Sequence, residues 1–355
     1  MIYILNLVVS CLYLSQIREK RLVAFLFKAF PVLLIWTLIV GGQYFVGADY
    51  LQYYNYFLNP NIISRFEPLF TITSHALYNY GFNGQAPFFF FALLNAIVIF
   101  IAAFRLEIKY WAIFYFLLVT VSTFFNNQMN GIRQCIAVTF VFWGFVELYR
   151  SKVFGSLLIV IAAGFHYTAI GCLLFLLLEK TTNIATRFPR MLLLLSIAIS
   201  FMPSNDLLNS QILSFLPNSV VESTSYEAMY ENNDMTSAST GFIYKLSKLI
   251  LVPVYWYALR LLKMNMLTEK ETLFFRFGLL SFSLRCVLLI NNLIGRFSYY
   301  FWIPSILPIY YLAVHFWKRK NIAALLLLLV YCSIAYFVKI ALGQNEYKSS
   351  FIYFQ

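Results

Sequence analysis

Residues 153–179 read VFGSLLIVIAAGFHYTAIGCLLFLLLE, a long apolar run whose middle contains Gly164-Phe165-His166. As a single helix, this run would cross a bilayer once and would reverse the side on which every later segment lies. As two short helices that turn near His166, it would return the chain to the side from which it came. Each arm is too short to cross alone, so such a hairpin is stable only if its turn is buried in protein or lines a wet cavity.

The composition indicates a membrane protein. Of 355 residues, 61% are hydrophobic and only 11% are charged, and the mean hydropathy is +0.75. A soluble chain of this size needs far more polar surface. Apart from the run above, segments suited to helices that cross the hydrocarbon core occur at residues 1–15, 22–41, 85–104, 110–125, 132–149, 190–203, 242–261, 272–291, 297–317 and 322–341.

The basic residues decide between the single span and the hairpin. Sixteen of the 26 Lys and Arg lie in short clusters between apolar segments, whereas residues 204–241 hold five carboxylates and no Lys or Arg. The clusters are Arg18/Lys20/Arg21, Arg105/Lys109, Arg150/Lys152, Lys180/Arg187/Arg190, Arg260/Lys263/Lys270 and Lys318/Arg319/Lys320. Cytoplasmic loops are rich in Lys and Arg, and all of the clusters fall on that side only if residues 153–179 form the hairpin. We therefore expect an all-α polytopic membrane protein with about 11–12 transmembrane helices, counting the short hairpin.

This topology has further consequences. Both termini and His166 are expected at the outer face, and residues 1–355 are expected to form a single integral membrane domain. Residues 42–84 would be an outer amphipathic loop, with a surface helix after Pro68, and residues 204–241 an outer acidic loop. The net charge of +12 mostly reflects cytoplasmic anchoring, so it does not indicate a nucleic-acid partner.

Several kinds of chemistry have no sequence support. The five cysteines all lie inside apolar runs and form no CxxC pair, so we interpret them as buried apolar side chains. The chain has three histidines, without the spacing of a metal site. There is no Walker A, GxSxG or HExxH motif. We expect neither a metal site nor a cofactor.

Two arginines begin apolar segments directly after polar turns. Arg133 follows residues 126–131, NNQMNG, and Arg296 follows residues 291–295, NNLIG. A helix start presents unpaired N–H groups and partial positive charge, which favour a phosphate. Two such arginines could clamp a pyrophosphate bidentately. The alternative is that each arginine pairs with an outer carboxylate or a lipid headgroup.

Other polar residues are less easily explained by the topology. Arg65 is expected at the outer face, and Arg285 near the middle of a span, facing either a carboxylate or an anion in the interior. Asp49 at the membrane edge could take a proton from a hydroxyl group, or it could cap a helix or pair with an outer arginine. Glu67 is expected to pair with Arg65 or Arg133. His166 is a second candidate base, or else a buried, hydrogen-bonded imidazole.

Five short motifs occur in order along the chain: GADY at 47–50 followed by Tyr53 and Tyr54, NGIRQ at 130–134, GFHYTA at 164–169, GRFSYY at 295–300 and NEYK at 345–348. Together they resemble the signature elements of the EpsG family. The members of this family are Wzy-type bacterial polysaccharide polymerases. The chain departs from that pattern where Tyr50 replaces the usual Thr, Thr168 replaces Ser and Glu346 replaces Pro.

The resemblance implies a glycosyltransferase with a GT-C-like architecture in the bacterial inner membrane. It would join undecaprenyl-pyrophosphate-linked oligosaccharide repeat units at the outer, periplasmic face, as in O-antigen (lipopolysaccharide) or capsule synthesis. The donor is already activated, so no nucleotide sugar is needed. Membrane lipid, a flippase and a chain-length regulator are the implied partners. The alternatives are a flippase or transporter for the same lipid-linked unit, or an O-antigen ligase.

The resemblance also gives roles to the candidate residues. The expected catalytic residues are Asp49, Glu67, Arg133 and His166, and which of Asp49, Glu67 and His166 is the base stays open. The expected pyrophosphate-binding residues are Arg133, Arg296, Arg285 and Arg65. The expected sugar or lipid contacts are Tyr50, Tyr54, Asn130, Gln134, Tyr299 and Tyr300.

Overall fold

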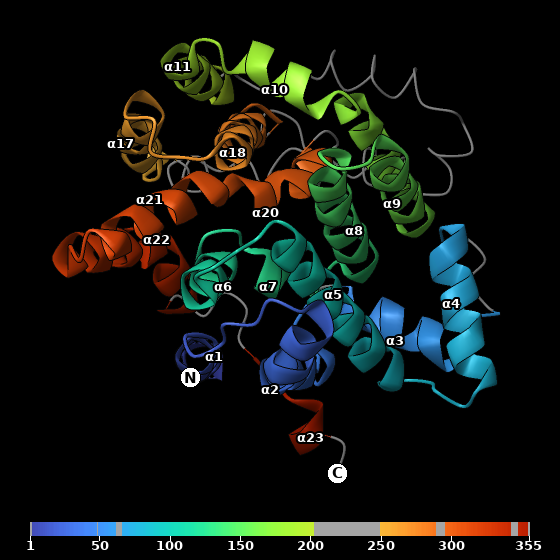
Figure 1. Cartoon of the computed structure of the whole chain (residues 1–355). Helices are drawn as coiled ribbons and strands as arrows, with labels where there is room; N and C mark the ends of the chain where they lie inside the picture. The colour runs from blue at the N-terminus through green and yellow to red at the C-terminus, as the bar shows by residue number, and fades with distance from the viewer. Residues whose placement is uncertain are drawn as a thin grey trace. The chain divides into compact units, whose positions relative to one another are not determined.

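The computed structural model describes residues 2–47, 49–61, 66–201, 249–288, 295–341 and 347–353 and is drawn in Figure 1. Within these ranges every regular element is helical, and a single isolated β-bridge pairs Gln43 with Ser349. The chain divides into unit 1, Met1–Leu178 with Tyr310–Gln355, and unit 2, Glu179–Ile309. The prediction of an all-α chain is confirmed.

Unit 1 contains most of the helices that the structure describes. Its elements are α1 (Ile2–Leu14), α2 (Leu22–Gly41), α3 (Tyr50–Leu58), α4 (Pro68–Asn79), α5 (Ala86–Arg105), α6 (Trp111–Thr120), α7 (Phe124–Asn127), α8 (Ile132–Leu148), α9 (Lys152–Phe165), η1 (Tyr167–Phe175), α22 (Ile322–Ala341) and α23 (Ser350–Tyr353). Unit 2 contains α10 (Leu178–Ala185), α11 (Pro189–Ser200), α17 (Val252–Lys263), α18 (Glu269–Val287), η3 (Arg296–Phe301) and α20 (Trp302–Ser305), and α21 (Leu307–Lys318) continues from it into unit 1.

The described helices include several candidate membrane spans. By length and hydropathy, three runs could each cross a membrane: α2, α5 and the run Arg296–Lys318. The pair η1 and α10, bent by 74°, qualifies as one broken span or re-entrant loop. Shorter apolar helices occur at α1, α6, α9, α11 and Ile322–Val338. Helices α2, α5, α8 and α22 begin and end within one residue of the expected segments 22–41, 85–104, 132–149 and 322–341. The expected span 297–317 consists of η3, α20 and α21, and the total of 11–12 stays a prediction. The expected acidic loop at 204–241 lies outside the described residues.

The segment that decides the topology breaks where the sequence predicts. Helix α9 ends at Phe165, His166 is extended with a φ of −156° and a ψ of 112°, and η1 begins at Tyr167 and packs against α9. Because α9 has 14 residues, it is about 21 Å long, which is shorter than the hydrocarbon core of about 30 Å. His166 therefore ends a helix that does not reach across a bilayer by itself.

Helix α8 is the central element of unit 1 and packs against both α5 and α9 (Figure 1). Close contact with α9 depends on Gly155, because a Cβ atom there would lie 2.7 Å from the backbone N of Leu148. Near the C-terminal end of α8, Arg105 pairs with Glu147 at 2.7 Å. The other end of α8 begins beside the polar turn that precedes Arg133. The basic clusters after α5 and α8 are therefore at the opposite end of α8 from Arg133.

Candidate functional site

Three predicted site residues meet at the start of α8. Arg133, the second residue of this helix, donates from Nη1 to Oε2 of Glu67 at 2.5 Å. Nδ1 of His166 lies 3.5 Å from Oε1 of the same carboxylate. The Glu67 side chain is 3% exposed, that of His166 9% and that of Arg133 25%. We call these three residues the Arg133 cluster.

The local sequence explains how Glu67 and His166 meet. Pro68 occupies the first position of α4, where its missing N–H is not needed, and Glu67 takes the N-cap position with a φ of −61° and a ψ of 150°. The next residue, Leu69, packs on Gly164, where a Cβ atom would lie 2.5 Å from the Leu69 Cγ. The glycine thus lets α4 approach the end of α9. Leu69 is two residues after Glu67 and Gly164 two residues before His166, so this contact brings Glu67 and His166 together. Of the two partners expected for Glu67, the structure has Arg133, while Arg65 lies outside the described residues.

Two aromatic residues hold the Arg133 guanidinium. Its Nε donates to the Tyr53 hydroxyl at 3.3 Å, and its Cζ lies 4.2 Å from the centroid of the Phe66 ring, within the range of a cation–π contact. Burial raises the pKa of the Tyr53 phenol, and the Arg133 guanidinium acts in the opposite direction. The net upward shift keeps this hydroxyl protonated and neutral at ordinary pH.

Asp49 is joined to the polar turn before α8. Its backbone N–H donates to Oδ1 of Asn130 at 3.2 Å, and its carboxylate acts electrostatically on Tyr53. Gly47 allows this approach, because a Cβ atom there would lie 2.6 Å from the Met129 carbonyl oxygen. Asp49 is at the N-cap position of α3. The backbone of the GADY motif is therefore in direct contact with the NGIRQ motif through the Asn130 side chain.

The GFHYTA motif also contributes a hydroxyl group. Oγ1 of Thr168 lies 3.3 Å from Nδ1 of His166, the same nitrogen that faces Glu67. The imidazole is thus positioned from two sides through one nitrogen. A buried histidine with polar neighbours agrees with both sequence interpretations of His166, the base and the hydrogen-bonded imidazole.

The remaining candidates of unit 1 are near the cluster but are placed differently. Tyr50 is 1% exposed, donates its hydroxyl to Oε1 of Gln85 at 2.7 Å and stacks on Tyr54. Tyr54 is partly exposed, whereas Gln134 is buried on the first turn of α8. Tyr50 is therefore buried at the start of α3, and Tyr54 is the more accessible of the two tyrosines.

Unit 2 holds the other arginines. Arg285 is 2% exposed on α18 and donates from Nη1 to Oγ of Ser305 at 2.7 Å. Arg296 begins η3 and is partly exposed, Tyr299 stacks on Trp302 at 4.1 Å, and Tyr300 is buried. Arg285 thus faces the interior, as expected. Arg133 belongs to unit 1 and Arg296 to unit 2, so a clamp formed by both stays a prediction.

Sequence reasoning missed three contacts of the Arg133 cluster: Tyr53, Phe66 and Thr168. Tyr53 is part of the first motif, but the expected sugar or lipid contacts include its neighbour Tyr54 and not Tyr53. Phe66 directly precedes Glu67. Because 20% of the chain is aromatic, nothing in the local sequence distinguishes Phe66 from the many other aromatic residues. Thr168 belongs to the GFHYTA motif and lies two residues after His166, where it is noticed only as one of three departures from the pattern that the motifs resemble.

Comparison with known proteins gives one result that covers nearly the whole chain. A search of curated proteins and a search of solved structures found no match. The model of the EpsG family matches residues 5–354, which include all five motifs and every residue of the Arg133 cluster. The chain belongs to the EpsG family.

Proposed function

We propose that the chain is a Wzy-type polysaccharide polymerase, a glycosyltransferase that joins lipid-pyrophosphate-linked oligosaccharide units. The proposal includes a single integral membrane domain of GT-C-like architecture in the bacterial inner membrane, with its active site facing the periplasm. The lipid is undecaprenyl pyrophosphate, and the product is an O-antigen or a capsule. Membership of the EpsG family supports this reading. The observation that carries it is the buried Glu67 carboxylate, which contacts both Arg133 and His166.

The reaction requires a base and a group that accepts negative charge. A hydroxyl oxygen of the incoming unit attacks the anomeric carbon of the growing chain. The bond from that carbon to the lipid diphosphate breaks, and its electron pair goes to the diphosphate oxygen. The hydroxyl proton goes to the base. Most of the charge develops on the leaving diphosphate, so stabilising that group is the main task of the enzyme.

Arg133 is suited to stabilise the negative charge of the leaving diphosphate. A guanidinium has five N–H donors in a planar fork, and within the described structure Glu67 and Tyr53 each take one from Arg133. The other N–H groups can donate to diphosphate oxygens while Glu67 and Phe66 keep the fork in one orientation. The side chain is 25% exposed, which gives access from outside the cluster. Charge-assisted, bidentate hydrogen bonds of this kind are stronger than neutral ones.

The Glu67–His166 pair is suited to receive the proton. The two groups lie 3.5 Å apart and both are largely buried, so the Glu67 carboxylate would stabilise the positive charge that the imidazole gains when it accepts the proton. Asp49 remains a third candidate, because Asn130 and Tyr53 connect it to the cluster. Arg296, Arg285 and Arg65 are proposed as further diphosphate contacts. Tyr54, Asn130, Gln134, Tyr299 and Tyr300 are proposed as sugar or lipid contacts.

The test is the glycan made by a strain that lacks the chain and carries Arg133→Ala on a plasmid. We expect single repeat units at the surface and no longer polymer, since the units still arrive but are not joined. Arg133→Lys keeps the charge but not the fork, so we expect little polymer from it. The matched control is Arg150→Gln, beyond the other end of α8, where an exposed pair with Glu107 contributes little.

Three outcomes would contradict the proposal. Full-length polymer from Arg133→Ala would exclude Arg133 from the reaction. A deletion strain without any surface units would favour a flippase. Polymer that forms normally but stays on its lipid carrier would favour a ligase.

A further inference from the structure

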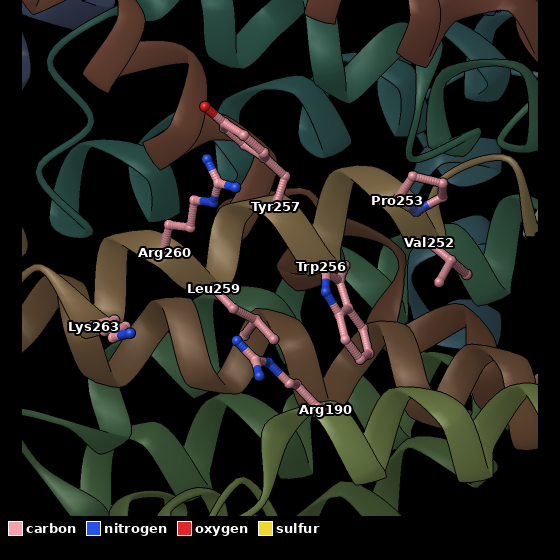
Figure 2. Close-up of a pocket in the computed structure, with 8 residues that line it drawn as sticks. All are labelled: Arg190, Val252, Pro253, Trp256, Tyr257, Leu259, Arg260 and Lys263. Carbon is pink, nitrogen blue, oxygen red and sulfur yellow. The ribbon is translucent and has the colours of Figure 1, made fainter.

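Unit 2 contains a cavity of about 480 Å³ between the start of α11 and the length of α17. Figure 2 shows Arg190 of α11 reaching toward Trp256 and Leu259 of α17, with Arg260 beside Tyr257. A second hollow of about 450 Å³ shares Arg190 and Lys263 with the first and adds Arg187 and Arg276. The two hollows form one surface, which we call the α11–α17 groove.

The groove gathers positive charge from two basic clusters that are far apart in the sequence. Arg187 and Arg190 come from one cluster, and Arg260 and Lys263 from another. The charge pattern of the sequence predicts both clusters on the cytoplasmic side, and their shared groove agrees with that prediction. No carboxylate lines either hollow. In the part of the chain that the structure describes, none of these four cations forms a salt bridge.

Aromatic rings support the cations instead. The Cζ of Arg190 lies 5.4 Å from the centroid of the Trp256 ring, and that of Arg260 lies 4.5 Å from the Tyr257 ring. A cation–π contact positions a guanidinium without neutralising it, so the groove keeps its full charge. By contrast, Arg105, the last residue of α5, pairs with a buried carboxylate, that of Glu147.

The helix ends make an anion more favourable here. Helix α11 begins at Pro189 and has no acidic residue in its first turn. A helix start carries partial positive charge, which favours anions and disfavours cations. Two arginines beside it, Arg187 and Arg190, add to that unfavourable field. A bound anion would relieve the repulsion and would accept hydrogen bonds from both guanidinium groups.

The surface next to the groove is apolar. On α11, Met191, Leu194 and Leu195 are 57%, 55% and 54% exposed, and they follow Arg190 along the helix. Trp256 and Tyr257 are also exposed beside the cations, as is usual for aromatic residues at the boundary between lipid and water. The ligand that fits has an anionic head for the groove and a hydrocarbon body for the exposed face of α11.

We infer that the α11–α17 groove binds the phosphodiester headgroup of an anionic glycerophospholipid in the cytoplasmic leaflet. The phosphate lies among Arg187, Arg190 and Lys263, and the acyl chains lie along Leu194 and Leu195. Basic pockets between membrane helices on that side bind such headgroups. No residue of the groove belongs to the Arg133 cluster, and the inference does not depend on the proposed polymerase reaction.

The test uses the purified full-length chain with phosphatidylglycerol as the probe. Native mass spectrometry measures how much phosphatidylglycerol stays bound after delipidation and titration, and phosphatidylcholine serves as the neutral comparison. The variant is Arg190→Gln with Lys263→Gln. We expect its apparent affinity for phosphatidylglycerol to fall by roughly 10- to 30-fold, as two headgroup cations are removed. The control is Lys318→Gln with Arg319→Gln, which removes the same charge from another predicted cytoplasmic cluster and should change little.

Inorganic phosphate and pyrophosphate in millimolar excess distinguish a lipid headgroup from a free anion. We expect neither to displace the lipid, because they lack acyl chains. Displacement by either would overturn the lipid assignment in favour of a soluble anion. Equal binding by the wild type and the double variant, or an equal loss in the control variant, would overturn the site itself. If the double variant cannot be purified, Arg190→Gln alone should weaken binding by roughly 5-fold.

Discussion

Glu67 accepts a hydrogen bond from Arg133, 66 positions later in the chain, with 2.5 Å between Oε2 and Nη1. The other carboxylate oxygen, Oε1, lies 3.5 Å from Nδ1 of His166. A carboxylate can accept on both oxygens at once, so this single buried group positions both a permanent cation and an imidazole. It also joins α4, α8 and the end of α9. Glu67 is therefore the residue on which the geometry of the candidate site depends.

Glu67→Gln keeps the shape of the side chain and removes its charge. Arg133 would then be a largely buried cation without its counter-ion. We expect a loss of about 3 kcal/mol in stability, near the lower end for a broken buried pair because Arg133 is 25% exposed. Thermal unfolding of the purified chain measures the loss, and the glycan ladder should show single units only. Glu107→Gln is the matched control, since its exposed pair with Arg150 is worth less than about 1 kcal/mol. Equal effects of both substitutions would contradict this role for Glu67.

Tyr53→Phe removes only the hydroxyl that accepts from Nε of Arg133. The ring and its packing stay, so we expect stability to fall by no more than about 3 kcal/mol, the upper end of the contribution of a hydrogen bond to a charged group. The guanidinium loses one of its two polar supports, and we expect about a tenfold slower chain lengthening in a repeat-unit polymerisation assay, corresponding to about 1.4 kcal/mol. Tyr80→Phe on an exposed residue (82%) is the control. A normal rate with Tyr53→Phe would show that Phe66 and Glu67 suffice to orient Arg133.

The helices were predictable because the signal for them is local. A membrane-crossing helix needs a run of apolar residues of fixed length, and the expected segments 22–41 and 322–341 coincide with α2 and α22. The break at His166 was predictable for a different reason. It follows from counting basic clusters along the chain, which requires no knowledge of any contact.

The contacts within the site were only partly predictable. A carboxylate partner for an outer arginine was expected on electrostatic grounds, yet Arg65 was as plausible as Arg133 because it is a near neighbour of Glu67 in the sequence. The contact between Glu67 and Arg133 depends on how α4 packs on α9 at Gly164, which no local pattern encodes. The aromatic supports were hidden for a similar reason. Rings are common throughout the chain, and only the fold selects Phe66 and Tyr53.

Gly47→Ala tests whether the contact between the first two motifs matters. The new methyl group would lie 2.6 Å from the Met129 carbonyl oxygen and 2.7 Å from the Asn130 Cα. Both are backbone atoms, so the segments must separate, and the hydrogen bond from the Asp49 N–H to Asn130 should be lost. We expect chain lengthening to fall by at least tenfold in the polymerisation assay, about 1.4 kcal/mol or more. Gly131→Ala is the control, because its nearest neighbour is a side-chain atom 4.0 Å away. Similar effects of both changes would mean that the contact has no special role.

Arg285→Met separates a structural role of the buried arginine from a role in binding an anion. Arg285 is 2% exposed and donates to Oγ of Ser305 at 2.7 Å. A buried charge is costly, and an apolar residue of similar volume in its place is often neutral or stabilising by about 1–4 kcal/mol. We therefore expect thermal stability of the purified variant to be unchanged or higher. If the charge helps to hold the diphosphate, chain lengthening should nevertheless be lost. Ser305→Ala keeps the charge of Arg285 and removes its hydrogen-bond acceptor. We therefore expect thermal stability to fall by about 1–3 kcal/mol while chain lengthening is retained. Full-length polymer from a stable Arg285→Met variant would remove Arg285 from the diphosphate site and leave its contact with Ser305 as a packing feature of unit 2.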